Sequence, residues 1–201
     1  MITVRNAEER GATRTGWLDS RHTFSFGHYF DPSHPGFRSL RVINDDRVSP
    51  GAGFGTHGHR DMEIISYVVE GAIAHRDSIG NVEKVPAGDV QRMTAGRGIQ
   101  HSEFNPSESE PLRFLQMWVI PRERGLEPGY EQRSFPREDR TGHFRLLISP
   151  DGEDGSLHIH QDVRLWGAIV PEGGRVDLAL AHAPHGWVQV VSGRVRLGEH
   201  D

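Results

Sequence analysis

Two histidines stand one residue apart at the start of HGHRDMEIISYVVEG, residues 57–71, and a carboxylate and an apolar run follow them. Side chains alternate between the two faces of a β-strand, so His57 and His59 point the same way and their nitrogens can converge on one ion. If the extended conformation continues, Glu63 lies on that face as well. The stretch therefore predicts one half of a metal site, with the remaining ligands supplied by another strand.

A second pair of ligand-type residues occurs in GRGIQHSEFN, residues 96–105, where His101 and Glu103 are again two positions apart. Two barrel strands that each contribute such a pair would offer three imidazole nitrogens and one carboxylate. That donor set suits a divalent transition metal such as iron, nickel, manganese, copper or cobalt, and it leaves positions open for water or substrate.

A competing His-x-His pair, His158 and His160, occurs in SLHIHQD. Taken alone, such a pair is more typical of a solvated strand face than of a metal site. No carboxylate follows His158 on the same face at short range, and no glycine-rich turn precedes it. The segment SPGAGFGTHGH, residues 49–59, instead brings a flexible glycine loop to the first pair and would let the backbone approach a ligand closely. Context therefore favours the first pair.

The composition of the 201-residue chain excludes several kinds of chemistry. It contains no cysteine, so disulfides, zinc–thiolate sites, iron–sulfur clusters and cysteine nucleophiles are ruled out, and any metal must have nitrogen and oxygen ligands. The 23 basic and 28 acidic residues give a net charge of −5, and the basic residues are scattered, which argues against direct binding of nucleic acid. No segment approaches the ~20 apolar residues of a membrane span. We expect a soluble cytoplasmic protein without membrane contact.

Short β-type runs separated by turn residues dominate the chain, which has 24 glycines and 12 prolines. No long window holds apolar residues at helical spacing, so the pattern predicts an all-β sandwich or barrel. The expected strands lie within residues 37–43, 62–69, 72–77, 112–120, 143–149, 156–170, 175–181, 187–193 and 194–198.

A polar segment, residues 122–143, carries charges, prolines and glycines without a sustained apolar period. We interpret it as a connector between an N-terminal module, residues 1–121, and a C-terminal module, residues 144–201. The second module ends soon after its glycine hairpin, so we expect it to be incomplete.

An internal repeat supports two modules. YVVEGAIAHRD (residues 67–77) and QVVSGRVRLGE (residues 189–199) share an apolar pair, a glycine and an alternating strand at an offset of 122 residues. Any β-hairpin in an all-β protein can look like this, which is the alternative explanation. At the same offset the first histidine pair falls on Ala179 and Ala181, so we expect the second module to lack the metal.

These residues carry a resemblance to a known family. The blocks GWLDSRHTFSFGHYFDPSHPGFRSLRVINDDRVSPGAGFGTHGHRDMEIISYVVEG, PAGDVQRMTAGRGIQHSEFN and LRFLQMWVIP closely resemble the pirin family of the cupin superfamily, especially its bacterial members, from about Gly16 to Pro121. The resemblance continues more weakly through HIHQD and the second module. It implies a bicupin, with two tandem jelly-roll (double-stranded β-helix) barrels and one metal ion in the first. The family ligands correspond to His57, His59, His101 and Glu103.

The two carboxylates Glu63 and Glu103 are rivals for the fourth ligand position. In general cupins a glutamate near Glu63 is often the ligand, and a histidine follows the P-x-G turn where this chain has Gln91. The pirin pattern pairs the carboxylate with His101, which favours Glu103. In the alternative interpretation, Glu63 is a strand-face carboxylate held by a neighbouring arginine or lysine.

The resemblance also implies a function. Bacterial pirin-like proteins are associated with quercetinase activity, in which a metal-dependent dioxygenase opens a flavonol such as quercetin with O₂ and releases carbon monoxide. The implied metal is Fe(II) first, with nickel, manganese, cobalt, copper or zinc as alternatives, and Glu103 would accept the substrate's hydroxyl proton. A flat aromatic substrate needs an apolar slot. Candidate lining residues are Phe54, Met93, Phe104 and Gln116, with Phe24, Phe26 and Trp118 as further candidates, although each suits plain core packing as well.

Two other hypotheses belong to different functional classes. Pirins are also described as iron-binding, redox-sensing regulators that act through protein partners, without catalysis. A metal-binding cupin whose flavonol turnover is a side activity is the third hypothesis. An open cleft beside the metal would favour catalysis, and a closed metal pocket with a charged surface would favour regulation.

Overall fold

The structure, a computed structural model, describes residues 2–180 and 185–198. Three single-turn 3₁₀ helices are present there, η1 (Ala7–Glu9), η2 (Glu138–Arg140) and η3 (Glu153–Gly155), and none of them is long enough to span a membrane. The strands are β1 (Gly11–Arg14), β2 (Leu18–His22), β3 (Leu40–Val48), β4 (Gly53–His59), β5 (Glu63–Glu70), β6 (Ala72–Asp77), β7 (Val82–Pro86), β8 (Asp89–Thr94), β9 (Ile99–Phe104), β10 (Leu112–Val119), β11 (Gly129–Ser134), β12 (Arg145–Ser149), β13 (Leu157–His158) and β14 (Leu165–Gly167). The prediction of an all-β fold is confirmed.

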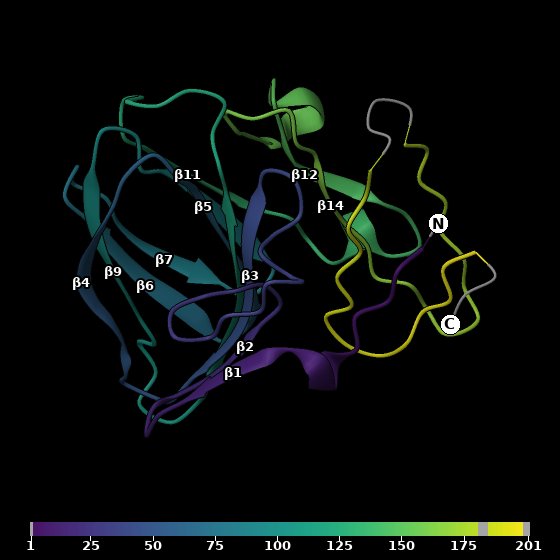
Figure 1. Cartoon of the computed structure of the whole chain (residues 1–201), viewed down its shortest axis with the longest axis horizontal. Helices are drawn as coiled ribbons and strands as arrows, with labels where there is room; N and C mark the ends of the chain where they lie inside the picture. Colours follow the sequence, from purple (N-terminus) through teal and green to yellow (C-terminus); the bar gives the residue numbers. More distant parts are fainter. Residues whose placement is uncertain (1, 181–184, 199–201) are drawn as a thin grey trace.

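Two sheets form the first module. The larger has the order β1-β2-β3-β10-β5-β8-β11, and the smaller has the order β4-β9-β6-β7. In Figure 1 the smaller sheet lies opposite the larger one, while the green and yellow second module lies beside β3. A third sheet, β13-β12-β14, belongs to that second module.

The space between the two sheets of the first module has an apolar end and a polar end. Val68, Ile73, Val85 and Phe114 are among the residues of a fully buried cluster at one end. Elsewhere in the interior, Ser66 on β5, Gln91 on β8 and Gln116 on β10 direct polar side chains toward Glu103 on β9. The interior therefore combines a packed apolar core with a group of buried, hydrogen-bonded polar side chains around Glu103.

The outer face of the larger sheet packs against the second module. Ile65 and Leu115 from the barrel share one buried cluster with Leu147, Ile148 and Leu157 from the second module. Strands β5 and β10 are consequently buried on both faces, because the barrel interior covers one face and the second module covers the other. This burial explains why LRFLQMWV reads as a nearly continuous apolar run rather than as a strict alternation.

The segment 122–143, expected to be a connector, contains strand β11. Residues of β11 pair antiparallel with β8, so that Tyr130 lies opposite Met93 at the edge of the larger sheet. The strand is only half-buried to exposed, which is why its residues lack an apolar period. The expectation of a plain connector is therefore wrong for residues 129–134, and the module boundaries at 121 and 144 stay predictions.

Three expected strands of the second module do not form in the described residues. None of the described positions in 175–181, 187–193 and 194–198 lies in a strand; Val188 and Leu197 are exposed there, whereas Trp187 and Val191 pack against the core. An alternating pattern makes a strand only where a neighbouring strand pairs with it, and none does in the described residues. Ala181 and residue 199, which the repeat comparison used, lie outside the described residues. The expected strand at 156–170 is reduced to β13 and β14.

Candidate metal centre

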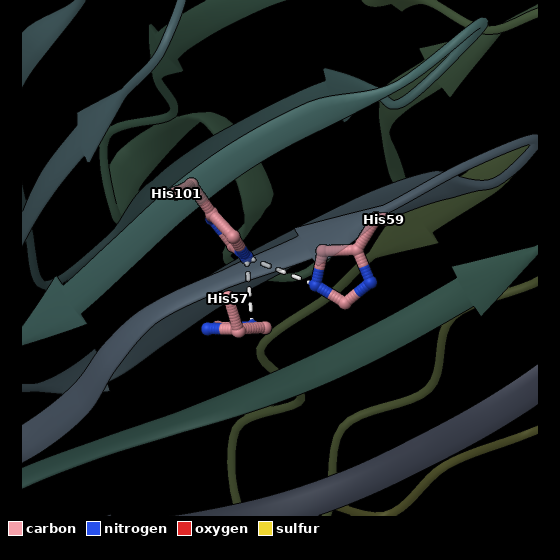
Figure 2. A group of neighbouring side chains, drawn as sticks. All are labelled: His57, His59 and His101. Carbon is pink, nitrogen blue, oxygen red and sulfur yellow. Dashed lines mark hydrogen bonds between the residues drawn. The ribbon is translucent and has the colours of Figure 1, made fainter.

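Three imidazoles from two adjacent strands meet in the first module (Figure 2). Strands β4 and β9 are antiparallel neighbours, and His57 lies directly opposite His101 in their register. The Nε2 atom of His101 is 3.1 Å from Nε2 of His57 and 3.1 Å from Nε2 of His59. The sequence-predicted pair on β4 and the histidine on β9 are therefore brought together.

The geometry of these nitrogens fits a bound ion. His57 donates its Nδ1 hydrogen to the Gly55 carbonyl oxygen, 2.8 Å away, so its Nε2 lone pair faces the other two rings. Two nitrogens that each bind an ion at about 2.0–2.1 Å lie roughly 3.0–3.4 Å apart. The observed separations of 3.1 Å fall within that range. Three imidazole nitrogens gathered at this distance are suited to a divalent cation, and a His₃ set is a common ligand set for such ions.

Burial keeps two of these histidines neutral. Desolvation, followed by proximity to His57, lowers the pKa of His59 to about 4. Desolvation, followed by the neighbouring His57 and His59, lowers the pKa of His101 to about 3. Neutral imidazole is the form that binds a metal, so the site is ready for an ion at neutral pH without first losing protons.

The same shifts predict how the metal-free protein responds to pH. Below the ordinary histidine pKa of 6.5, the imidazoles of His59 and His101 are protonated in the unfolded chain. In the folded protein they stay neutral, because their pKa values are lower. Their contribution to stability is therefore fully present above pH 6.5 and is lost as the pH falls toward 4 and below. We expect the thermal midpoint of the metal-free protein to fall between about pH 7.5 and about pH 5, and to fall less steeply in His59→Gln. Circular dichroism melts would check this, and parallel curves for the two proteins would contradict it.

Glu103 lies on the same face of β9 as His101 and is as deeply buried. It accepts hydrogen bonds from Ser66 Oγ at 3.1 Å and Gln91 Nε2 at 2.6 Å on Oε1, and from Gln116 Nε2 at 2.9 Å on Oε2. Complete burial raises the pKa of its carboxyl group, which the nearby His75 and the hydrogen bonds partly offset. Its ligand atom lies within 4.8 Å of those of His75 and His101, in a second group that shares His101 with the first.

His75 and Asp77 were missed by sequence reasoning. His75 on β6 is buried, its Nε2 atom lies 3.0 Å from Asp77 Oδ2, and its ring lies 5.5 Å from His101 and 4.7 Å from Tyr130. The sequence of this strand, AIAHRD, could have indicated them. Ile73, His75 and Asp77 are every second residue and so share one face, and Ile73 is a core residue, which predicts that this face points inward.

Glu63 does not join the site. A turn at residues 60–62, with Asp61 at a positive φ of 51°, separates β4 from β5, so the extended conformation does not continue from His59. Glu63 is fully buried on the opposite face of β5 from Ser66, where it accepts from Thr94 Oγ1 at 3.1 Å and lies 3.9 Å from Arg92 Nε. The expectation that Glu63 shares the histidine face is wrong, and the alternative of a carboxylate held by an arginine describes its environment.

The second His-x-His pair serves the contact between modules. The rings of His158 and His160 are 4.5 Å apart, and His160 Nδ1 lies 3.3 Å from Glu63 Oε1. This places the pair on the outer side of the larger sheet, away from the interior where His101 lies. Neither histidine belongs to a metal-type group among the described residues.

The candidate substrate contacts occupy different environments. Met93 is buried among Ile64 and Ile99, and Phe54 packs edge-on against Phe114 toward the apolar end of the barrel. Phe104 is 39% exposed and points to the opposite face of β9 from Glu103, so the structure does not bring it to the site.

A groove lies beside the histidines. Its volume is about 460 Å³ and it is open to solvent. Residues that line it include Gly58, His59, Arg60, Ser78, Gly98 and Gln100.

The close approach of β4 and β9 depends on a glycine. Gly53 lies opposite Phe104, and a Cβ at position 53 would lie 2.3 Å from the Glu103 carbonyl oxygen and 2.5 Å from the Phe104 Cα. The atoms that the new Cβ would contact belong to the backbone of β9 and cannot change rotamer as a side chain can. Gly53→Ala must therefore push the two strands apart. We expect a loss of about 1–3 kcal/mol in unfolding free energy and weaker divalent-ion binding, measured by urea unfolding and metal titration.

Gly55→Ala is the matched control for this substitution. A Cβ at position 55 meets no atom within 4 Å, and the carbonyl that accepts from His57 is retained. This variant should keep wild-type stability and ion binding. Equal behaviour of the two alanine variants would contradict a role for Gly53 in strand spacing.

Fold and site together define a β-barrel protein with a histidine-rich metal centre, and comparisons with known proteins give its family. A family model described as Pirin matches residues 3–119, and one described as Quercetinase C-terminal cupin domain matches residues 146–201. The chain belongs to the pirin family. The predicted pirin-type bicupin fold class is thereby confirmed.

Relatives of the chain carry both enzyme and pirin names. It is 51% identical over 199 residues to a protein of Escherichia coli strain K12 named quercetin 2,3-dioxygenase, with 98% of this chain and 84% of that protein covered. It is 40% identical to a pirin-like protein of Caulobacter vibrioides, covering 98% and 85%. The crystal structure of bacterial pirin YhhW from Escherichia coli in complex with nickel(II) matches with a TM-score of 0.79 and 55% identity, over 83% of this chain and 70% of that one.

Proposed function

We propose that this chain is a metal-dependent dioxygenase that opens the ring of a flavonol such as quercetin with O₂ and releases carbon monoxide. The observation that carries the proposal is the convergence of three imidazoles, with His101 Nε2 3.1 Å from the Nε2 atoms of both His57 and His59, beside a buried carboxylate. The 51% identity to a quercetin 2,3-dioxygenase over nearly the whole chain supports an oxidoreductase of the dioxygenase type.

The proposed ligands are His57, His59, His101 and Glu103. Three nitrogen donors and one oxygen donor suit Fe(II), which we propose first, and also nickel, manganese, cobalt, copper and zinc. The nickel complex of YhhW supports a divalent ion in a protein of this fold. When bound, such an ion supplies Lewis-acid activation of the substrate oxygens and a path for electron density toward O₂.

The residues of the chain would bind the substrate as an anion. Three neutral imidazoles and one carboxylate neutralise only one of the two charges of a divalent ion, so a deprotonated flavonol is favoured over a neutral one. Glu103 is the proposed acceptor of the flavonol hydroxyl proton, and in that step it would act as a base beside the ion rather than as its ligand; burial raises the pKa of its carboxyl group and so strengthens it as a base. The ring of Trp118 packs 5.0 Å from that of His59 and helps to keep bulk water from the centre.

An anaerobic reconstitution followed by quercetin turnover tests this function. Protein loaded with iron, nickel, cobalt, manganese or copper is given quercetin and O₂, and carbon monoxide is measured. We expect release by the wild type with at least one metal, and its loss in His57→Ala and Glu103→Ala. If no metal supports carbon monoxide release, the dioxygenase proposal fails, and an iron-binding regulator acting through protein partners becomes the better hypothesis.

A further inference from the structure

The hydrogen bonds around Glu103 leave one position on its carboxylate open. Oε1 accepts from both Ser66 Oγ and Gln91 Nε2, whereas Oε2 accepts only from Gln116 Nε2 among the described residues. A carboxylate oxygen accepts about two hydrogen bonds. Oε1 is therefore filled, and Oε2 retains one lone pair for another partner.

The orientation of the Gln116 amide is set by Trp118. The indole Nε1–H of Trp118 donates to Gln116 Oε1 over 3.1 Å. An indole N–H can only donate, so the amide oxygen must face Trp118 and the NH₂ group must face Glu103. With both ends of its amide engaged, Gln116 holds the carboxylate rather than standing free to contact a substrate.

The equivalent arrangement at Gln91 is less firmly fixed. Tyr130 Oη lies 3.0 Å from Gln91 Oε1 and 3.0 Å from Gln132 Oε1, and its single hydrogen must serve both oxygens. The Gln132 amide nitrogen is engaged elsewhere, with Lys84 O and Asp89 Oδ2, so Gln132 cannot turn its NH₂ group to the phenol. Of the two aromatic donors, Trp118 provides the stronger orientation.

Trp118 also touches a proposed ligand directly. Its ring meets the His59 ring edge-to-face, with centroids 5.0 Å apart and an interplanar angle of 80°. On its other side it meets Phe26 at 5.4 Å, also edge-to-face, which limits its movement. One side chain on β10 therefore contacts a histidine from the smaller sheet and, through Gln116, orients the carboxylate.

We propose that Trp118 is a positioning residue of the metal centre, whose N–H sets the Gln116 amide so that Glu103 presents the open lone pair of Oε2 to the ion. The inference rests on the proposed metal centre, but it does not depend on which substrate is turned over. It assigns Gln116 a different role from substrate binding, since the amide of Gln116 orients a ligand.

Cobalt(II) binding by the folded protein tests this inference, because its visible absorption reports the number and geometry of ligands. Trp118→Phe keeps an aromatic ring and removes only the N–H donor. We expect a 10–100-fold loss of affinity, the range for changes that disturb the partner of a ligand, together with a changed cobalt spectrum. Trp166→Phe, on β14 of the second module, is the matched control and should bind like the wild type.

A double-mutant cycle tests whether Trp118 acts through Gln116. Gln116→Met removes the amide at similar volume, and the double variant should bind cobalt no more weakly than Gln116→Met alone, within about threefold. If the losses of cobalt affinity in the two single variants add up in the double variant, Trp118 does not act through Gln116. If Trp118→Phe binds cobalt with wild-type affinity and an unchanged spectrum, the proposal is overturned. A wild type that binds no cobalt overturns both the inference and the metal centre. A wild type that binds cobalt and shows the expected variant effects, yet releases no carbon monoxide with any metal, overturns only the proposed reaction.

Discussion

Replacing His101 with alanine is expected to weaken divalent-ion binding by more than about 100-fold, beyond what disturbing a partner of a ligand costs, and to abolish carbon monoxide release. His101 is the central ring of the site, because its Nε2 atom is 3.1 Å from the Nε2 atoms of both other histidines. It also belongs to both groups of metal-type ligands in the described residues. Without it, the pair on β4 has no nitrogen donor from the opposite strand.

Isothermal titration with nickel(II) or cobalt(II) would measure this loss. His158→Ala is the matched control, because it removes one histidine of the other His-x-His pair and lies on the second module. The control should keep wild-type affinity and full metal stoichiometry. Comparable losses in the two variants, or an unchanged affinity in His101→Ala, would contradict the proposed ligand set. Circular dichroism of both metal-free variants would separate loss of the site from loss of the fold.

The candidate site was predictable where one physical rule sufficed. The alternation of side chains along a strand predicted that His57 shares a face with His59, and His101 with Glu103. Strand β9 follows this rule, because His101 and Glu103 are buried while their neighbours in the strand are not. The rule failed at Glu63 because it assumes an unbroken strand. The turn through Asp61 depends on a positive φ, which aspartate adopts more often than most residues but still only in a minority of cases, so the residue type alone does not predict it.

Strands that line the polar part of the barrel were harder to predict. Strand β8 reads DVQRMT and is buried at every position, although four of its six residues are polar or charged. Gln91 faces Glu103 in the interior, and Arg92 faces Glu63 and Glu131 under the second module. Hydrophobic periodicity identifies a strand by its apolar face, so it misses one whose two faces bury polar groups with specific partners. Those partners come from distant parts of the chain and are known only once the fold is known.

Replacing Arg113 with alanine is expected to lower the free energy of unfolding by about 3 kcal/mol, the cost of leaving one member of a buried ion pair without its partner. The Arg113 guanidinium on β10 binds Asp45 on β3 through two hydrogen bonds, of 2.9 Å and 2.8 Å, and both side chains are about 90% buried. Its Nη2 also donates to the Val191 carbonyl oxygen over 2.7 Å. One side chain therefore joins two central barrel strands to the C-terminal part of the second module.

Urea unfolding of the metal-free protein, followed by tryptophan fluorescence, would measure this effect. Arg175→Ala is the matched control, because Arg175 pairs with Asp177 at the surface, where both side chains are more than 70% exposed and solvent screens the charges. The control midpoint should equal that of the wild type within error. Arg113→Met separates packing from charge, since it fills part of the volume yet still leaves Asp45 buried without a partner, and should remain clearly less stable than the wild type. Recovery of full stability in Arg113→Met would mean that the apolar stem of Arg113, rather than its pairing with Asp45, holds the two modules together.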